Sequence, residues 1–353
     1  MPLSKIVAKS ITDDTITTDQ IADTSVHGRR NLIINGAVNV HQRNADNTAS
    51  DTFGPDRYRL QFSGGGTTMS QEDMTSSDTP YSSGFRNFLR IKNTTTASGA
   101  GNYRQITYRL EAQDIANSGW DYTSTSAYMT VSFWVRSSVA GKFYFTLETG
   151  ASGSDKYYGF SETLVADTWK KVEHSVPGNS TLTFANSNAR GLGFIVRGWL
   201  GTNYTDSGFT EDTWGSFSLS SLAGDDLANW AGTTNSTLDV VGLQMEVGDK
   251  ATPFEHRSFG EELALCQRYY EINMMVTQSY ANASQHIGIN ASYMTTKRAA
   301  ATVSWTNEAQ GNMTGTAPEA IFRNRVDGAY AYQYCAAAGN YYQYYLFKAD
   351  AEL

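Results

Sequence analysis

Several residue types are scarce in this chain of 353 residues, and each scarcity excludes a class of protein. Only two cysteines are present, Cys266 and Cys335, so the sequence does not describe a disulfide scaffold and is expected to assemble in a reducing cytoplasm. Charged residues make up 18%, and the formal net charge is -8. Because phosphate backbones are bound by clustered Lys and Arg, this balance excludes a nucleic-acid partner.

Signals for membranes and for catalysis are also missing. No apolar run approaches the roughly 18 residues of a membrane-spanning helix, and the N-terminus lacks the apolar stretch of a signal peptide. The common hydrolase and nucleotide-binding motifs are absent, and the five histidines lie far apart in sequence. We therefore expect no catalytic residue, metal or cofactor. The acidic pairs Glu211–Asp212 and Asp225–Asp226 fit solvated loop charges better than the two acids of a glycosidase.

What the chain does contain favours β-structure. Aromatic residues reach 12%, with 21 Tyr, and there are 31 Gly, while long helical runs of Glu, Lys and Leu are absent. Aromatic and β-branched side chains suit pleated sheets, and Gly and Asn suit turns. The sequence predicts an all-β chain with an N-terminal trimerising or attachment segment (1–30), a central β-sandwich or jelly roll (31–258), a short linking helix (259–271) and a small C-terminal β domain (272–353).

Alternation of apolar and polar residues marks the expected strands. Residues 128–136 (YMTVSFWVR) place Met129, Val131, Phe133 and Val135 on one face of a strand. Further strands are expected at 31–36, 56–62, 143–147, 170–176, 192–199 and 238–247. Short strands at this spacing, separated by polar turns, suggest a sandwich or jelly roll.

The first thirty residues contain an isoleucine row with a period of five. Its members are Ile6, Ile11, Ile16, Ile21 and Val26, separated by polar residues. This period fits neither one face of a helix nor one face of a strand. A core shared by identical parallel chains would bury the row, which predicts a trimerisation segment; a disordered tail is the alternative.

Residues 261–271 (EELALCQRYYE) predict the one clear helix. Leu263, Cys266 and Tyr270 fall on one stripe, and acidic residues stand at its start, where the helix dipole favours them. In a trimer this stripe is expected to pack against its copies near the axis, with Glu262 and Arg268 pairing between chains.

One long motif resembles tailed-phage structural proteins. It runs from Gln244-Met245-Glu246-Val247-Gly248 through Ala251-Thr252-Pro253-Phe254-Glu255-His256-Arg257-Ser258 to the segment 261–270. In phage tail fibre and tail-associated proteins a similar pattern ends a jelly roll and leads into a C-terminal domain. The opening Asn31–Ala37 with His41-Gln42-Arg43 looks like the start of that domain. Segments 130–136 and 166–172 are similar to carbohydrate-binding jelly rolls, although many sandwiches share such segments without binding sugar.

Aromatic residues are the candidate receptor contacts. Sugar rings stack on exposed aromatic planes while nearby polar groups bind the hydroxyls, so aromatics in polar loops are sugar-binding candidates; the alternative is that they cap the sandwich or pack between subunits. The loop candidates are Trp199, Tyr204, Trp214 and Trp230. The C-terminal candidates, which could instead line a threefold axis, are Tyr330, Tyr332, Tyr334, Tyr341, Tyr342, Tyr344 and Tyr345.

These observations and the resemblance together predict a non-enzymatic, trimeric phage tail fibre in the virion. Its N-terminus would join other tail proteins, and its C-terminus would contact a host surface polysaccharide or outer-membrane receptor through multivalent binding. Two alternatives are a polysaccharide-degrading tailspike and a virion decoration protein without a receptor role.

Overall fold

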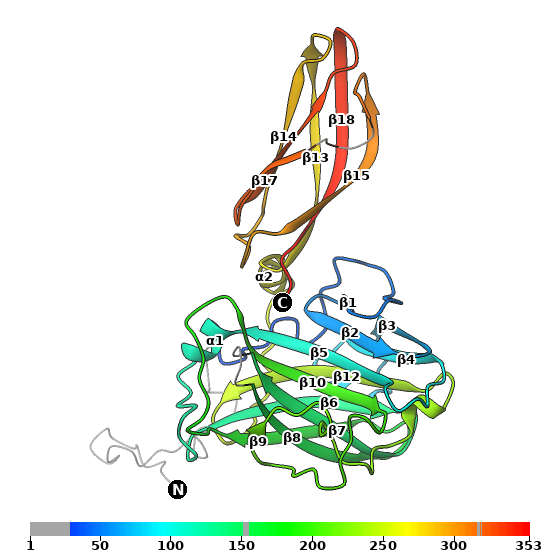
Figure 1. Cartoon of the computed structure of the whole chain (residues 1–353), viewed down its shortest axis with the longest axis vertical. Coiled ribbons are helices and arrows are strands. Elements are labelled where there is room, and N and C mark those ends of the chain that lie inside the picture. Colours follow the sequence, from blue (N-terminus) through cyan, green and yellow to red (C-terminus); the bar gives the residue numbers. More distant parts are fainter. Residues whose placement is uncertain (1–28, 151–154, 316–317, 319) are drawn as a thin grey trace, which may run out of the picture.

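The computed structural model describes residues 29–150, 155–315, 318 and 320–353, which form two units of antiparallel sheet (Figure 1). The helix α2 (Phe259–Gln267) lies between them. The prediction of an all-β chain is confirmed. The attachment segment predicted at 1–30 lies outside the described residues, apart from residues 29 and 30. The whole isoleucine row is among the residues that are not described, so the trimerisation segment stays a prediction.

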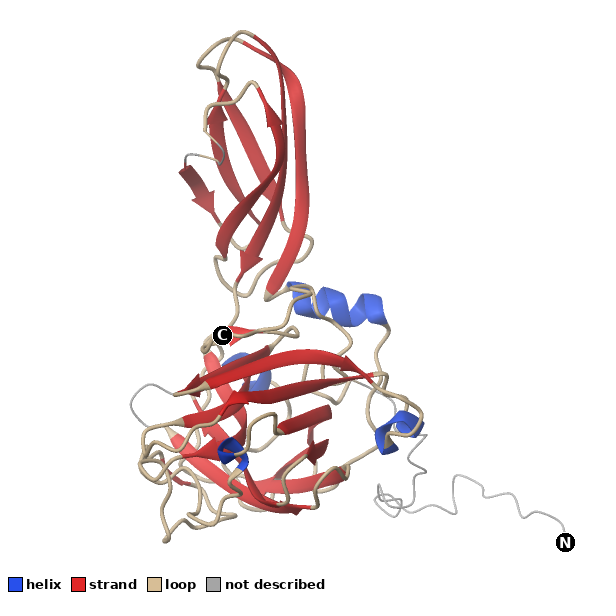
Figure 2. Cartoon of the chain, turned by 90° about the vertical axis from the view of Figure 1, so that its right-hand side faces the viewer, coloured by secondary structure: helices blue, strands red, loops and turns tan. Residues whose placement is uncertain are grey.

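The larger unit is a sandwich of two sheets, which lies beneath the elongated smaller unit (Figure 2). Most consecutive strands cross from one sheet to the other, as in a jelly roll. The seven-stranded sheet has the order β1 (Thr52–Phe53), β2 (Tyr58–Ser63), β5 (Tyr103–Glu111), β10 (Arg190–Leu200), β7 (Gly141–Thr149), β8 (Lys156–Leu164) and β11 (Gly215–Ser216). The five-stranded sheet has the order β3 (Gly66–Asp73), β4 (Asn87–Thr95), β12 (Thr237–Val247), β6 (Tyr128–Ser137) and β9 (Lys170–Pro177).

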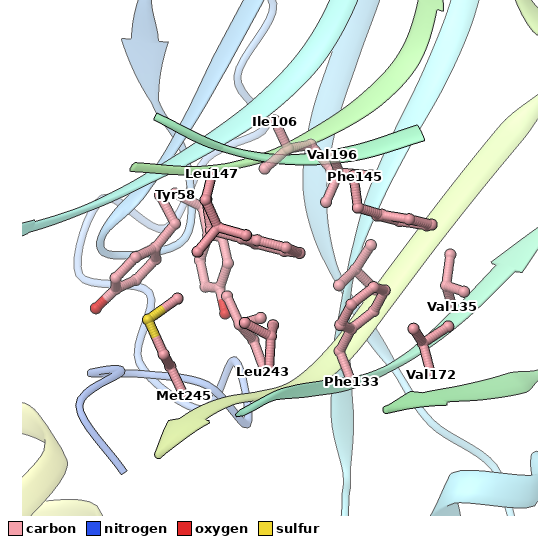
Figure 3. Packing of buried hydrophobic residues seen from close by; sticks show 14 of the residues in the cluster. Tyr58, Ile106, Phe133, Val135, Phe145, Leu147, Val172, Val196, Leu243 and Met245 are labelled. Carbon is pink, nitrogen blue, oxygen red and sulfur yellow. The ribbon is translucent and has the colours of Figure 1, made fainter. Parts of the chain in front are cut away.

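The core lies between these sheets because each contributes one apolar face (Figure 3). The alternate residues of β6 that the sequence assigns to one face are all buried there. Phe133 of β6 meets Phe145 of β7 with ring centroids 4.8 Å apart. Each fully buried side chain of this size contributes about 1.5–3 kcal/mol to folding, so the alternation accounts for the pairing of the two sheets.

The strand predictions hold at six places and fail at one. Strands predicted around 56–62, 128–136, 143–147, 170–176, 192–199 and 238–247 are observed as β2, β6, β7, β9, β10 and β12. The strand predicted at 31–36 is wrong. There the Asn31 side chain accepts hydrogen bonds from the backbone of Ile33 and of Met245, and Asn35, at φ 61°, bonds Val40 through its side chain. Asparagine side chains here replace the partners that a strand ladder would supply.

The remaining helical elements are short. They are α1 (Ala112–Ala116) and the 3-10 turns η4 (Thr79–Ser83) and η5 (Trp230–Gly232). The predicted helix at 261–271 is correct in kind but ends early, because α2 stops at Gln267 and Tyr270 already begins the next strand. None of the described helices is long and apolar enough to span a membrane.

The smaller unit pairs two three-stranded sheets. One contains β13 (Tyr270–Ala281), β18 (Gly339–Asp350) and β15 (Thr302–Gly311), and the other β14 (His286–Ser292), β17 (Gly328–Tyr334) and β16 (Ala320–Asn324). Its core is rich in alanine, and a polar network joins the sheets: the Tyr345 hydroxyl donates to Gln333 at 2.6 Å and Gln343 donates to the same oxygen at 2.8 Å. Buried polar groups that are paired in this way fix which strands face one another.

Ion pairs within the chain fasten the two units together. Glu352, after β18, pairs with Arg57 of the sandwich, and both side chains are 2% exposed. Arg268, after α2, donates two hydrogen bonds of 2.8 Å to Glu111 at the end of β5. Glu262 accepts from the Asn35 backbone at 2.6 Å. The prediction that Glu262 and Arg268 pair between chains is therefore wrong, because their partners lie in the same chain.

The same junction fixes the position of the C-terminus. Strand β18 runs back from the far end of the smaller unit, so the last residues lie against the sandwich (Figure 1). The far end consists of the turns at 282–285 and 335–338. The C-terminal unit extends away from the sandwich, but the chain end does not. Strand β18 runs antiparallel to β13, the first strand of the unit, so the chain returns to the side of the unit that contacts the sandwich.

The buried pair at the junction predicts a large stability effect. Changing Glu352 to Gln leaves the Arg57 charge buried without its carboxylate, which is expected to cost roughly 3–5 kcal/mol of unfolding free energy in chemical denaturation. Glu173→Gln is the matched control, because Glu173 pairs with Lys171 on an exposed surface and should change stability by about 1 kcal/mol or less. Equal effects of the two substitutions would contradict this account of the junction.

Asp56, beside the same junction, predicts a pH dependence. Burial raises the pKa of Asp56 to about 6, although Arg43 and Gln42 oppose the shift. A raised pKa in the folded state means that Asp56 favours folding below its unfolded pKa, and that this contribution is lost as the pH rises through about 6. The unfolding free energy of Asp56→Asn, relative to that of the parent chain, should therefore be higher at pH 7.5 than near pH 4, by about 2 kcal/mol. Denaturation of both chains at both pH values measures this difference, and an equal relative stability at the two pH values would contradict it.

Candidate functional site

The four loop aromatics predicted from the sequence do not form one site. Trp230 is fully buried, so it has no ring face for a ligand, and that candidate is wrong. Trp199 and Trp214 are half-buried against the sandwich core, and Trp214 also donates to the Pro177 carbonyl at 2.7 Å. Tyr204 instead lies on the outer side of the seven-stranded sheet, where its ring meets Tyr103 at 5.8 Å, edge to face.

The outer face of the seven-stranded sheet is polar. Along β5 the residues Ile106, Tyr108 and Leu110 point into the core, so Gln105 and Arg109 point outward. Strand register places the outward side chains in rows across β2, β5, β10 and β7. We call this surface the polar face; it consists of Arg59, Gln61, Tyr103, Gln105, Thr107, Arg109, Thr146, Glu148, Arg190, Gly193, Ile195 and Arg197.

A chain of hydrogen bonds crosses the polar face. Arg197 donates to Glu148 at 2.6 Å and to the Gln105 side chain. Gln105 donates in turn to Gln61 at 3.0 Å, and Gln61 donates to Asp51 at 2.9 Å. Burial acts to lower the pKa of Arg197, but Tyr157 and Glu148 outweigh it and the pKa is raised. The guanidinium therefore stays charged, and it fixes the orientation of the amides beside it.

Residues 201–229 form a wall along one side of the polar face. Phe209 packs over Gly159, where an added Cβ would lie 2.5 Å from the ring. Lys142 binds Glu211 at 2.8 Å and Asp226 at 3.0 Å, so one ammonium holds two acidic residues of the loop. Asp212 lies 3.2 Å from His174. These acids were predicted to be solvated loop charges, but Glu211 and Asp226 anchor the loop to β7.

Gly193 is the one position of its row in the polar face that carries no side chain. It lies between Arg109 of β5 and Glu148 of β7 in one row of the sheet. An added Cβ would have no contact closer than 3.7 Å, so packing does not require glycine there. The row therefore has no side chain of its own between a cation and a carboxylate, although the glycine itself is buried.

Two cavities lie near other parts of the sandwich. One of about 450 Å³ adjoins the polar face at Arg190 and is lined also by Phe184 and Gly191. The other, of about 500 Å³, lies on the outer side of the five-stranded sheet against Trp134, Phe254 and His256. Among the described residues, no group of three His, Cys, Asp or Glu side chains is placed to hold a metal ion.

The C-terminal tyrosines divide by strand face. Tyr330, Tyr332 and Tyr334 are half-exposed on the outer face of β17, where the ring of His286 stacks on Tyr332 at 4.8 Å. On β18, Tyr342 is exposed, and Tyr341 and Tyr344 are half-buried. Tyr345 is 1% exposed and belongs to the polar network of the core, so it is wrong as a receptor contact.

The helix candidates for trimerisation also have contacts within the chain. Cys266 and Tyr270 are buried, and Arg43 stacks on the Tyr270 ring at 3.6 Å from its centre. Leu263 is half-buried. The predicted helical stripe is not observed, because Tyr270 belongs to β13 rather than to the helix. Cys266 and Tyr270 are buried by residues of their own chain.

Comparisons with known proteins yield only distant likenesses. No protein-family model and no curated protein matches this chain. Among solved structures, the enzymatically active domain of tailspike protein 4 from bacteriophage CBA120 aligns with a TM-score of 0.34 at 8% identity, over 62% of this chain and 21% of the tailspike chain. The family 11 carbohydrate-binding module of Clostridium thermocellum gives 0.28 at 13% identity, over 60% and 98%. A xylan-binding domain of Paenibacillus barcinonensis gives 0.27 at 12%, over 59% and 94%. At these TM-scores the likenesses establish neither kinship nor function.

Most of the polar face was not predicted from the sequence. Its signal is the strict alternation in 103–111 (YRQITYRLE), where polar residues alternate with Ile106, Tyr108 and Leu110. That pattern marks an outward polar strand face but does not say which strands lie beside it. Only Tyr204, at the edge of the polar face, was among the candidates.

Proposed function

We propose that this chain is a non-catalytic, glycan-binding subunit of a phage tail fibre, and that the polar face is its glycan-binding surface. The observation that carries the proposal is the cross-strand chain from Glu148 through Arg197 and Gln105 to Gln61, beside the rings of Tyr103 and Tyr204. Oriented amides, a guanidinium and a carboxylate match the hydroxyl groups of a sugar, and tyrosine rings offer apolar planes to its C–H faces.

Preorganisation supports this reading. The amide and guanidinium groups are already held by one another, so a ligand would not have to order them. Gly193 adds no side chain to the middle of the polar face, and the wall of residues 201–229 borders one side. A ligand lying across the strands would contact several rows at once.

The tail-fibre part of the proposal rests on the motif at 244–270, which resembles tailed-phage structural proteins. In this arrangement the N-terminal segment joins three chains and attaches them to the other tail proteins of the virion. The C-terminal unit, with His286, Tyr332 and Tyr334 outward, extends away from the sandwich and is a second surface for the host receptor. Repetition over three chains would turn weak glycan contacts into firm adhesion.

A side chain added at Gly193 tests the glycan-binding surface. Gly193→Leu places a side chain over the sheet floor and should weaken binding to the responsive glycan of an array by about tenfold or more, which is about 1.4 kcal/mol. Affinity is measured by calorimetry on the full chain, with circular dichroism to show that the fold is kept. Gly215→Leu, at the open edge strand β11, is the control and should bind normally. Unchanged binding by Gly193→Leu would move the glycan site elsewhere.

The assembly is tested by sedimentation. The full chain at micromolar concentration should sediment with three times its mass of 38.7 kDa. A chain beginning at residue 29 should keep the sandwich fold but lose the trimer, because the isoleucine row is proposed to supply the shared core. A full-length monomer would refute the trimer.

A further inference from the structure

Arg109 on the polar face has an unusual environment. Its guanidinium has no hydrogen-bond or ion-pair partner among the described residues, and its Nε is buried without an acceptor. The neighbouring arginines are paired: Arg59 with Asp51, Arg190 with Asp155, and Arg197 with Glu148. A half-buried charge without a bonded counter-charge costs free energy, and Glu148 and Asp51 attract Arg109 only from beyond ion-pair distance.

Nearby like charges increase that cost. Burial, together with Arg59 and Arg190, lowers the pKa of Arg109 to about 10. Even at that value Arg109 is a cation at neutral pH. Four arginines face three carboxylates here, 4 − 3 = +1, in a chain whose net charge is -8. The polar face therefore carries a local positive excess that the rest of the protein does not share.

Other buried polar groups of the polar face also lack hydrogen-bond partners within the described part of the chain. The Nε atoms of Arg59 and Arg197 and the hydroxyl of Thr146 are also buried without a partner. Three of these four groups are N–H donors with no capacity to accept, and among the described residues the one buried acceptor without a partner nearby is Asp155 Oδ1, on the carboxylate that pairs with Arg190. Buried donors are normally paired, so the three guanidinium Nε groups lack acceptors that a bound group could supply. Gly193 lies beside Arg109 in the same row and places no side chain against its half-exposed guanidinium.

We propose that Arg109 binds the anionic group of an acidic saccharide, so that the glycan bound on the polar face is an acidic one. This inference rests on the proposed function. A carboxylate, sulfate or phosphate would supply both the missing charge and the missing acceptors, and a guanidinium binds such groups through parallel hydrogen bonds. Glu148 remains available to accept from a sugar hydroxyl beside the anion.

The test compares matched polysaccharides with the full chain by calorimetry. Polygalacturonate is compared with its carboxyl-reduced, neutral form, and a sulfated galactan and a phosphomannan are compared with their unsubstituted forms to separate the three anions. At least one acidic member should bind about tenfold or more tighter than its neutral partner, and the preference should fall as salt is added. Equal affinity within all three pairs would overturn the inference and leave glycan binding intact. If no saccharide binds, the proposed function fails, and the inference with it.

Arg109→Gln tests whether this one arginine causes the preference for the acidic saccharide. The variant should lose the preference for the acidic member, so that its affinities for the two members of the pair become equal. Its melting temperature should equal or exceed that of the parent, because an uncompensated charge has been removed, whereas a structural arginine would leave it lower. Arg325→Gln, an exposed arginine of the C-terminal unit, removes the same charge and should keep the preference. An unchanged preference in Arg109→Gln would overturn the proposal.

Discussion

The junction between the two units depends on the buried pair of Arg57 and Glu352. Arg57 also donates to the Arg109 carbonyl of β5 and lies 3.4 Å below the ring centre of Tyr269, so one guanidinium contacts the sandwich, the linker and the chain end. A buried ion pair adds little net stability over apolar residues, but it is intolerant of a missing partner. Such a contact specifies geometry: the second unit folds against the sandwich in the one orientation that brings Glu352 to Arg57.

This geometry links the junction to the polar face. Strand β5 ends at Glu111, which is held by Arg268 and by the Tyr269 hydroxyl at 2.7 Å, and the outward residues of the same strand form the middle of the polar face. The end of that face is therefore fixed by the same residues that orient the C-terminal unit. A ligand on the polar face and a receptor at the far turns would be held in a constant relation, which suits a fibre that must engage a surface with repeated copies.

Local patterns were read correctly from the sequence, and pairings between distant segments were not. The alternation in β6 predicts a strand and its buried side because one apolar face alone decides both. Tyr345 is different, since Tyr341, Tyr342, Tyr344 and Tyr345 fall on both faces of β18. The inward face is decided by the network with Gln333, ten or more residues away. The strand expected at 31–36 fails for the same reason, because Asn31 bonds Met245 across the fold.

The polar face could not be predicted from the sequence, because the sequence does not give the register between distant strands. Its rows join Arg59, Thr107, Ile195 and Thr146, which come from four strands far apart in sequence. Each strand separately shows only an ordinary polar face, as most sandwiches do. The unpaired arginine becomes visible only when register sets Arg59 and Arg190 beside it and Gly193 next to it. A surface that gathers cations in an acidic protein, and leaves one guanidinium without a bonded partner, keeps a cost that the fold offsets only in part. That cost has a physical reason if a ligand carrying negative charge removes it.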